Sequence, residues 1–192
     1  MEVVLASASP RRLELLKQVG IQARVCPANF AEEAGKADAA NQVVLHNALG
    51  KCRVVAAQVG DAVPVVAADT VVVVDDDILG KPADAQAAAA MLNRLSGRAH
   101  QVLTGVAVRF AGKELAQVCA TKVFFRHLTQ AEIAAYVAGG EPLDKAGAYG
   151  IQGQGASSGS VPGKAQCRTA GHDDRDAGLP AHGRGLPERW GL

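Results

Sequence analysis

Two apolar runs stand almost end to end near the middle of the chain, and a carboxylate and a threonine separate them. Val63 to Asp69 and Val71 to Val74 are nearly continuous runs of valine and alanine, which is typical of buried strands. A charge within such a run is costly unless it has a partner or a chemical role. A surface aspartate at a bend between two strands is the alternative. The pattern favours buried strands that carry a functional carboxylate, Asp69.

The rest of the chain, up to about residue 153, alternates between helical and strand patterns. Ser9, Asp84 and Thr129 stand where N-caps are expected. We expect helices over residues 10–19, 40–59, 84–95 and 129–138, and strands over residues 3–6, 21–26, 100–109 and 114–126. Some strands follow each other directly, so the order indicates an α/β fold with a mixed sheet and helices on both faces.

Composition excludes several classes of protein. The 192 residues suffice for one ordinary domain or two small lobes, and 20 basic against 19 acidic residues give a net charge of +1. This balance argues against a nucleic-acid or polybasic membrane surface. The sequence has no apolar run of about 18 residues and no signal-peptide pattern at its start. The cysteines lie far apart, which predicts reduced thiols in a cytoplasmic protein: Cys26, Cys52, Cys119 and Cys167.

Several cationic residues are candidates for binding phosphate. Ser7 to Arg12 spans the junction of a strand and a helix, where backbone N–H groups favour anions and arginines add bidentate donors. A capped surface helix with solvated arginines is the alternative. Lys81, on a short loop, and Lys51, on the helix over residues 40–59, are weaker candidates, because a solvated lysine is the default for each.

A glycine-rich segment from Glu141 to Gly153 resembles neither a helix nor a strand. Its lysine, tyrosine and glutamine residues favour a binding loop, since a flexible linker would be rich in serine. The histidines His46, His100 and His127 lack the spacing of metal ligands and are interpreted as structural or surface residues. The common glycine-rich nucleotide-binding motifs are missing from the sequence.

Five stretches, taken together in their order and spacing, resemble the Maf family of nucleoside triphosphate pyrophosphatases. They cover residues 5–16, 68–72, 79–82, 95–104 and 141–153. The resemblance extends over about residues 3–153. It implies a two-lobed mixed sheet flanked by helices, with the nucleotide in the cleft between the lobes. It also implies a cytoplasmic enzyme, a divalent metal cation such as Mg²⁺ or Mn²⁺, and a homodimer.

The same resemblance implies hydrolysis of dTTP and UTP to the monophosphate and pyrophosphate. By the family pattern, Asp69 accepts the proton of the attacking water, although the residues alone leave open that it is a metal ligand instead. The other implied roles are base selection by Arg11, Thr70 and Gln152, phosphate binding by Ser7, Arg12, Lys51 and Lys81, and a metal site of Glu32 with Asp69.

Two other functions remain as alternatives to the pyrophosphatase. One is a regulator of cell division or septum formation that binds a nucleotide without turning it over. The other is a hydrolase that removes modified nucleotides. Release of pyrophosphate from dTTP or UTP separates the first alternative from an enzyme, and a panel of triphosphates separates the second.

The amino-acid composition of the sequence changes after residue 153. Residues 154–192 are rich in glycine and poor in large apolar side chains, so they cannot bury enough surface to offset the entropy of ordering. We therefore divide the chain into a Maf-like domain over residues 1–153, incomplete at its C-terminal end, and a disordered tail over residues 154–192. Because the family continues with an apolar strand and a closing helix, we interpret the tail as a frameshift product.

Overall fold

The computed structural model describes residues 2–150 and 163–167. These residues form the helices α1 (Pro10–Gln18), α2 (Ala40–Val59), α3 (Ala85–Leu95) and α4 (Gln130–Ala138). The strands are β1 (Glu2–Leu5), β2 (Gln22–Val25), β3 (Val65–Val74), β4 (Asp77–Leu79), β5 (Ala99–Phe110), β6 (Lys113–Phe125) and β7 (Gly163–Cys167). Short 3-10 helices cover Ala37–Ala39, Glu141–Asp144 and Ala146–Ala148.

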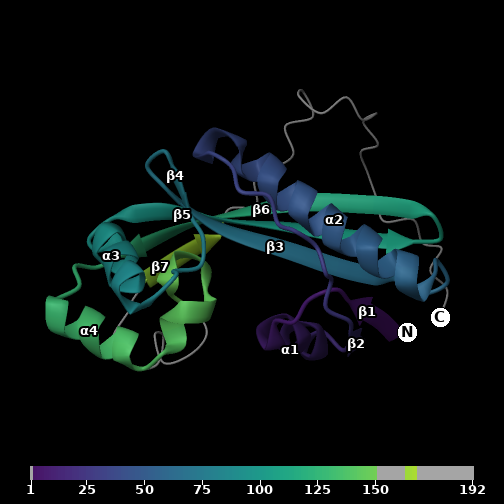
Figure 1. Cartoon of the computed structure of the whole chain (residues 1–192), viewed down its shortest axis with the longest axis horizontal. Helices are drawn as coiled ribbons and strands as arrows, with labels where there is room; N and C mark the ends of the chain where they lie inside the picture. The colour runs from purple at the N-terminus through teal and green to yellow at the C-terminus, as the bar shows by residue number, and fades with distance from the viewer. Residues whose placement is uncertain (1, 151–162, 168–192) are drawn as a thin grey trace.

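The strands form one mixed sheet in the order β2-β1-β3-β5-β6-β7, and β4 pairs with the end of β3. Strand β1 runs parallel to both of its neighbours, whereas the pairs β3–β5, β5–β6 and β6–β7 are antiparallel. Figure 1 shows α2 lying along the long strands, α3 and α4 at one end of the molecule, and α1 with β1 and β2 at the other. The predicted α/β class with a mixed sheet is confirmed.

Strand β3 differs from the expectation of two separate runs. It is one continuous strand, because Ala68 and Thr70 on either side of Asp69 both stay in register with β5. Asp69 is only 6% exposed, so the alternative of a surface aspartate at a bend is wrong. The carboxylate therefore lies inside a central strand, where its charge needs partners.

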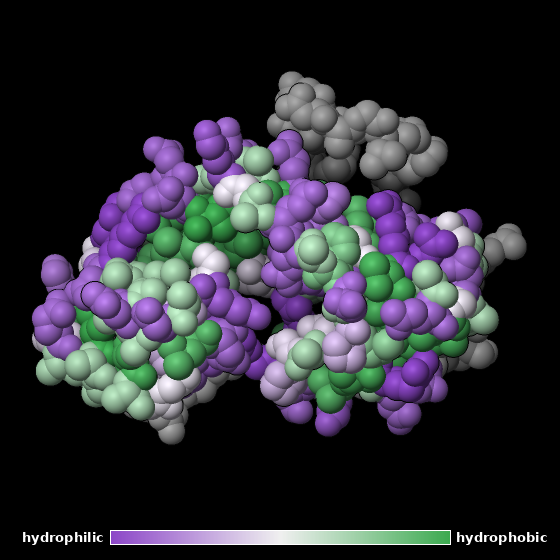
Figure 2. Space-filling view, viewed as in Figure 1, coloured by the Kyte–Doolittle hydropathy of each residue, from purple (hydrophilic) through white to green (hydrophobic). Residues whose placement is uncertain are grey.

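The two larger of three hydrophobic core clusters lie in separate lobes of the molecule, as expected. The first lies between α2 and the sheet, and the second between α3, α4 and the other end of the long strands. Residues of the first core include Val4, Ala48, Cys52, Val55, Val65 and Ala67, and residues of the second include Val72, Val74, Leu92, Leu95, Ile133 and Tyr136. Strand β3 thus passes from one core to the other, and Asp69 lies between them. Figure 2 shows a hollow between the lobes with hydrophilic residues around it.

The predicted helix starts are confirmed, and two of them have side-chain caps. The Asp84 carboxylate accepts a hydrogen bond from the Ala87 N–H at 2.7 Å. Thr129 and Glu132 form a reciprocal capping box at the start of α4. Ser9 stands at the N-cap of α1, but its side chain makes no capping hydrogen bond there. Its backbone N–H instead donates to the Ser7 hydroxyl at 3.2 Å.

The expected disordered tail over residues 154–192 is wrong for one short segment. Strand β7 pairs antiparallel with the Thr121–Phe125 part of β6. A strand edge offers free backbone groups, so pairing there does not require the apolar side chains that the prediction considered. The remaining residues of that tail lie outside the described part of the chain. Among the described residues, no helix is both long and apolar enough to cross a membrane.

Candidate functional site

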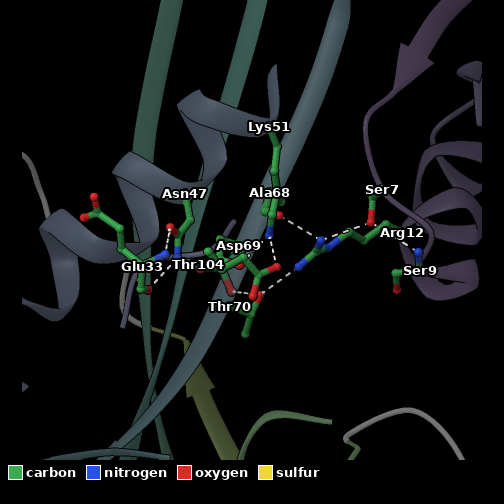
Figure 3. Close-up of polar contacts among 11 residues, drawn as sticks. Ser7, Ser9, Arg12, Glu33, Asn47, Lys51, Ala68, Asp69, Thr70 and Thr104 are labelled. Atoms are coloured by element: carbon green, nitrogen blue, oxygen red, sulfur yellow. Dashed lines mark hydrogen bonds and ion pairs between the residues drawn. The ribbon is translucent and has the colours of Figure 1, made fainter. Parts of the chain in front are cut away.

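The carboxylate of Asp69 is held by one cation and one neutral donor, both from α2 (Figure 3). The Lys51 ammonium donates to Asp69 Oδ1 at 2.7 Å, and Asn47 Nδ2 donates to Oδ2 at 3.0 Å. The side chains of Lys51 and Asp69 are each no more than 10% exposed. A buried charge with two such partners is both stabilised and fixed in orientation.

Helix α2 approaches the sheet closely enough for these contacts because of a glycine. Asn47 and Lys51 are four residues apart, so they share one helix face. Gly105 of β5 lies opposite Asp69, and a Cβ atom on it would stand 2.4 Å from the backbone oxygen of Val44. The bare backbone at Gly105 therefore sets the distance from α2 to Asp69.

Asn47 is a site residue that the sequence analysis missed. It follows Val43 and Val44 by about one turn and precedes Ala48, so it stands on the apolar stripe of α2. It is 2% exposed. A polar residue on a buried stripe was the signal that could have identified it, because a buried amide requires hydrogen-bond partners.

The loop between β2 and α2 brings two acidic residues to the same place. Glu32 Oε1 lies 2.6 Å from the Lys51 Nζ atom. Asn47 binds the backbone of Glu33 on both sides: its Oδ1 accepts from the Glu33 N–H at 2.8 Å, and its Nδ2 donates to the Glu33 carbonyl at 3.1 Å. Glu32, Lys51, Asn47 and Asp69 therefore form one connected polar group.

Arg12 joins the start of α1 to β3 on the other side of Asp69. Its Nη1 donates to the Ser7 hydroxyl at 3.1 Å and to the Ala68 carbonyl at 2.8 Å, and its Nη2 donates to Thr70 Oγ1 at 3.4 Å. Burial lowers the pKa of Arg12, while the charges of Asp69 and Glu32 act in the opposite direction. The guanidinium stays protonated, since arginine does not lose its proton in proteins.

Two of the predicted site residues are not part of this network, and a third is not among the described residues. Arg11 and Lys81 make no hydrogen bond or ion pair within the described part of the chain, and Lys81 is exposed. Arg11 acts electrostatically on the second lobe, where the pKa of Asp144 is lowered first by the hydrogen bond from Lys145 and further by the Arg11 charge. Gln152 lies outside the described residues.

The segment before Gln152 is anchored to the second lobe by two tyrosines. The Tyr136 hydroxyl accepts from the Gly150 N–H at 3.3 Å, and the Tyr149 hydroxyl lies 2.6 Å from His100 Nε2. His100 is 3% exposed, and burial lowers its pKa to about 4. The interpretation of His100 as a structural residue is confirmed. The predicted binding loop includes two short 3-10 helices rather than open loop alone.

The acidic residues fit a divalent cation with few protein ligands. Oxygens of Glu32 and Asp69 approach the same Lys51 nitrogen, at 2.6 and 2.7 Å, so they converge on one position of positive charge. Mg²⁺ is commonly held by one or two carboxylates together with water and substrate phosphates. Within residues 2–150 and 163–167, no cluster of three acidic, histidine or cysteine side chains forms a closed metal cage.

A separate cavity of about 480 Å³ lies near the turn between β3 and β4. Its lining includes Asp38, Asp75, Asp76, His100 and Lys122. The cavity contains none of the residues predicted for phosphate, base or metal binding.

Known proteins match most of the chain. The family model described as Maf-like protein matches residues 2–161. A dTTP/UTP pyrophosphatase of Symbiobacterium thermophilum is 51% identical over 156 residues, which are 81% of this chain and 80% of the relative. A dTTP/UTP pyrophosphatase of Escherichia coli K12 is 47% identical over 151 residues, 79% of this chain and 77% of the relative.

A solved structure of a nucleoside-triphosphatase, or dITP/XTP pyrophosphatase, from Mycobacterium abscessus aligns with 67% of this chain and 76% of its own. The TM-score is 0.47 and the identity 19%. The assignment rests instead on the family model and on the two relatives. The family model matches residues that include the whole network around Asp69, and the relatives are about half identical over four fifths of the chain. The chain belongs to the Maf family.

Proposed function

We propose that the protein is a nucleoside triphosphate pyrophosphatase that converts dTTP and UTP to the monophosphate and pyrophosphate. The observation that carries the proposal is the buried Asp69 carboxylate, fixed between the lobes with Lys51 and Arg12 on either side. The names of the Symbiobacterium and Escherichia relatives support the same reaction and the same two substrates.

The reaction is a hydrolysis in which Asp69 acts as the proton acceptor. Water forms a bond from its oxygen to the α-phosphorus, and its proton passes to the carboxylate. The bond from the α-phosphorus to the bridging oxygen breaks, and that oxygen leaves with pyrophosphate. The neutral Asn47 donor and the Lys51 cation each bind one oxygen of Asp69 and so orient the carboxylate, as a general base must be oriented.

The cationic residues neutralise the triphosphate and the charge that develops on the leaving group. Arg12 supplies a planar donor already fixed by Ser7 and Ala68, and such donors aimed at developing charge stabilise a transition state. Lys51 reaches the same region from α2. Lys81 is exposed and free to reach the outer phosphates from the loop before α3.

A divalent cation, Mg²⁺ or Mn²⁺, completes the proposed site, with Glu32 and Asp69 as its protein ligands. When bound, it neutralises phosphate oxygens and lowers the pKa of a bound water. Glu32 and Asp69 would provide the oxygen donors that such an ion prefers, and Lys51 would then be able to contact the phosphates.

Selection of the base is assigned to Arg11, Thr70 and Gln152. The Thr70 hydroxyl is held between Arg12 and the Thr104 hydroxyl, 3.1 Å away, which fixes its direction on β3. The charge of Arg11 acts on the second lobe. These positions support a pyrimidine preference by their match to the family pattern. The same pattern supports a cytoplasmic location and a homodimer. Sedimentation of the purified protein tests whether it is a dimer.

The experiment is a panel of nucleoside triphosphates with separate detection of pyrophosphate and inorganic phosphate. We expect pyrophosphate from dTTP and UTP in the presence of Mg²⁺ or Mn²⁺, and little from purine or modified triphosphates. Equal turnover of modified purine triphosphates would favour the alternative hydrolase. Tight binding of UTP without any product would favour the regulator.

A further inference from the structure

We propose that Asn47 is a positioning residue for the reaction. Its side-chain amide fixes the direction of the Asp69 carboxylate and joins it to the loop that carries Glu32 and Glu33. The inference rests on the function proposed above, because it concerns the same carboxylate. It concerns a residue on α2 that matches none of the motifs in the sequence.

The hydrogen-bonding capacity of Asn47 is used within the protein. One amide nitrogen donates both to Asp69 Oδ2, at 3.0 Å, and to the Glu33 carbonyl, at 3.1 Å. The amide oxygen accepts from the Glu33 N–H at 2.8 Å. Because the side chain is 2% exposed, it presents no surface to a ligand. The role open to Asn47 is therefore to hold other groups in place.

Asn47 and Lys51 divide the two oxygens of Asp69 between them. Lys51 binds Oδ1, but it is also paired with Glu32, and an ammonium is attracted to phosphate oxygens. Asn47 is neutral and bonded internally, so a triphosphate does not compete for it. The Asn47 contact therefore keeps the plane of the carboxylate fixed when Lys51 turns toward the phosphates.

The loop contacts α2 at several points, and two of these provide a matched comparison. At one point, the Phe30 ring packs on Gly50 so closely that a Cβ atom on Gly50 would stand 2.2 Å from the ring. At the other, Asn47 holds the backbone of Glu33. Asn47 also contacts Asp69, whereas Phe30 makes an apolar packing contact with Gly50. A substitution of Phe30 therefore loosens the loop without removing a hydrogen bond from Asp69.

The first test compares Asn47→Leu with Phe30→Ala in the full-length protein, with UTP as substrate. Leucine has the same number of side-chain heavy atoms and the same branching as asparagine but no donor, so Asp69 Oδ2 loses its hydrogen bond. We expect Asn47→Leu to lower kcat by about 10- to 100-fold, the range for residues that orient a reactive group, with KM changed less than about threefold. Phe30→Ala is expected to change KM more than kcat. A kcat for Asn47→Leu within twofold of wild type would overturn the proposal, as would a KM effect like that of Phe30→Ala.

The second test is a double-mutant cycle. In an Asp69→Asn background there is no carboxylate to orient, so adding Asn47→Leu is expected to leave the residual kcat unchanged. Damage that is merely structural would lower it again by the same factor. A second full loss of kcat in the double variant would therefore contradict the positioning role.

A measurement that does not depend on activity separates this proposal from the proposed function. The Tm values of Asn47→Leu, Asp69→Ala and the double variant are expected to be coupled, with the double loss smaller than the sum of the single losses. If the wild type releases no pyrophosphate from any triphosphate, the proposed function is wrong. Coupled Tm values would then still assign Asn47 to holding Asp69, and additive ones would overturn this inference too.

Discussion

Gly105 lies directly opposite Asp69 in the pairing of β3 with β5, and a Cβ atom on Gly105 would stand 2.4 Å from the backbone oxygen of Val44. The strand that carries the carboxylate and the helix that carries its partners are thus held together across a glycine. Real Cβ atoms essentially never lie this close to another atom. If Gly105 is replaced by a residue with a side chain, α2 must therefore move. The position of the helix and the chemistry of the site are linked at this residue.

Gly105→Ala is expected to lower both stability and activity. The added methyl group meets helix backbone rather than a flexible side chain, so the helix shifts away from β5, and overpacking of this kind costs about 1–3 kcal/mol. Thermal unfolding and the kcat for UTP check the prediction. Val106→Ala, at the neighbouring and partly exposed position of the same strand, is the control and should leave kcat near the wild-type value. Full activity and an unchanged Tm for Gly105→Ala would refute the role of the glycine.

Arg12→Ala and Lys81→Ala should both lower kcat/KM for the triphosphate, but only Arg12→Ala should lower Tm. A charged hydrogen bond contributes about 1.5–3 kcal/mol, so kcat/KM for UTP should fall by at least about tenfold in each variant. Arg12→Ala also leaves the Ala68 carbonyl without its donor and should lower Tm, whereas exposed Lys81 should not affect Tm. Exposed Lys17 serves as the control through Lys17→Ala. Changes in kcat/KM below twofold in both variants would show that neither side chain binds the triphosphate.

The buried His100 should make the protein less stable in mild acid. Burial lowers its pKa to about 4 from the ordinary value of 6.5, so the unfolded chain binds a proton at this residue before the folded protein does. Stability is therefore intact above pH 6.5 and is lost as the pH falls toward 4, by an amount on the order of 3 kcal/mol.

Comparison with His100→Gln isolates the effect of this histidine. Glutamine retains a polar group near Tyr149 but does not titrate in this range. The free energy of unfolding of the variant should therefore depend less on pH between 7 and about 4 than that of the wild type. The two proteins share every carboxylate, which removes acid effects common to both. Parallel pH profiles for the wild type and the variant would show that His100 does not contribute.

The coding DNA tests the interpretation of residues 154–192 as an out-of-frame segment. The match to the Symbiobacterium relative leaves about a fifth of each chain outside it, since it covers 81% of this chain and 80% of the relative. We expect that a one-base shift near codon 155 restores an apolar strand and a helix start with the order Gly-Leu-Pro. If neither alternative frame contains these features, the interpretation is wrong.

Local signals predicted much of the fold. The caps at Asp84 and Thr129 placed two helix starts, and the apolar stripe of α2 placed that helix over the residues it occupies. Strand β7 could not be predicted in this way, because its backbone pairs with an edge of β6 and its sequence has no apolar pattern. Strand continuity through Asp69 was also missed, since the partners that stabilise a buried carboxylate lie far away in the sequence.

Only part of the site could be predicted, because some of its contacts also join residues that lie far apart in the sequence. Arg12 and Lys51 belong to motifs and could be named from the sequence, and both contact the Asp69 region. Asn47 belongs to no motif, and its role depends on the closeness of α2 to β5. That closeness depends on Gly105, which lies 58 positions further along the chain. Tertiary contact, rather than local pattern, thus selects the neutral partner of the carboxylate.

The most direct measurement of the central claim is hydrolysis of UTP in oxygen-18 water by the wild type and by Asp69→Asn. We expect labelled UMP and unlabelled pyrophosphate from the wild type, because water attacks the α-phosphorus. Asp69→Asn should be slower by about 10²–10⁴-fold, as for loss of a general base, while staying folded. Asp76→Asn, at an exposed turn, is the matched control and should keep its rate. Formation of UDP with inorganic phosphate, label in pyrophosphate, or a near-normal rate for Asp69→Asn would contradict the account.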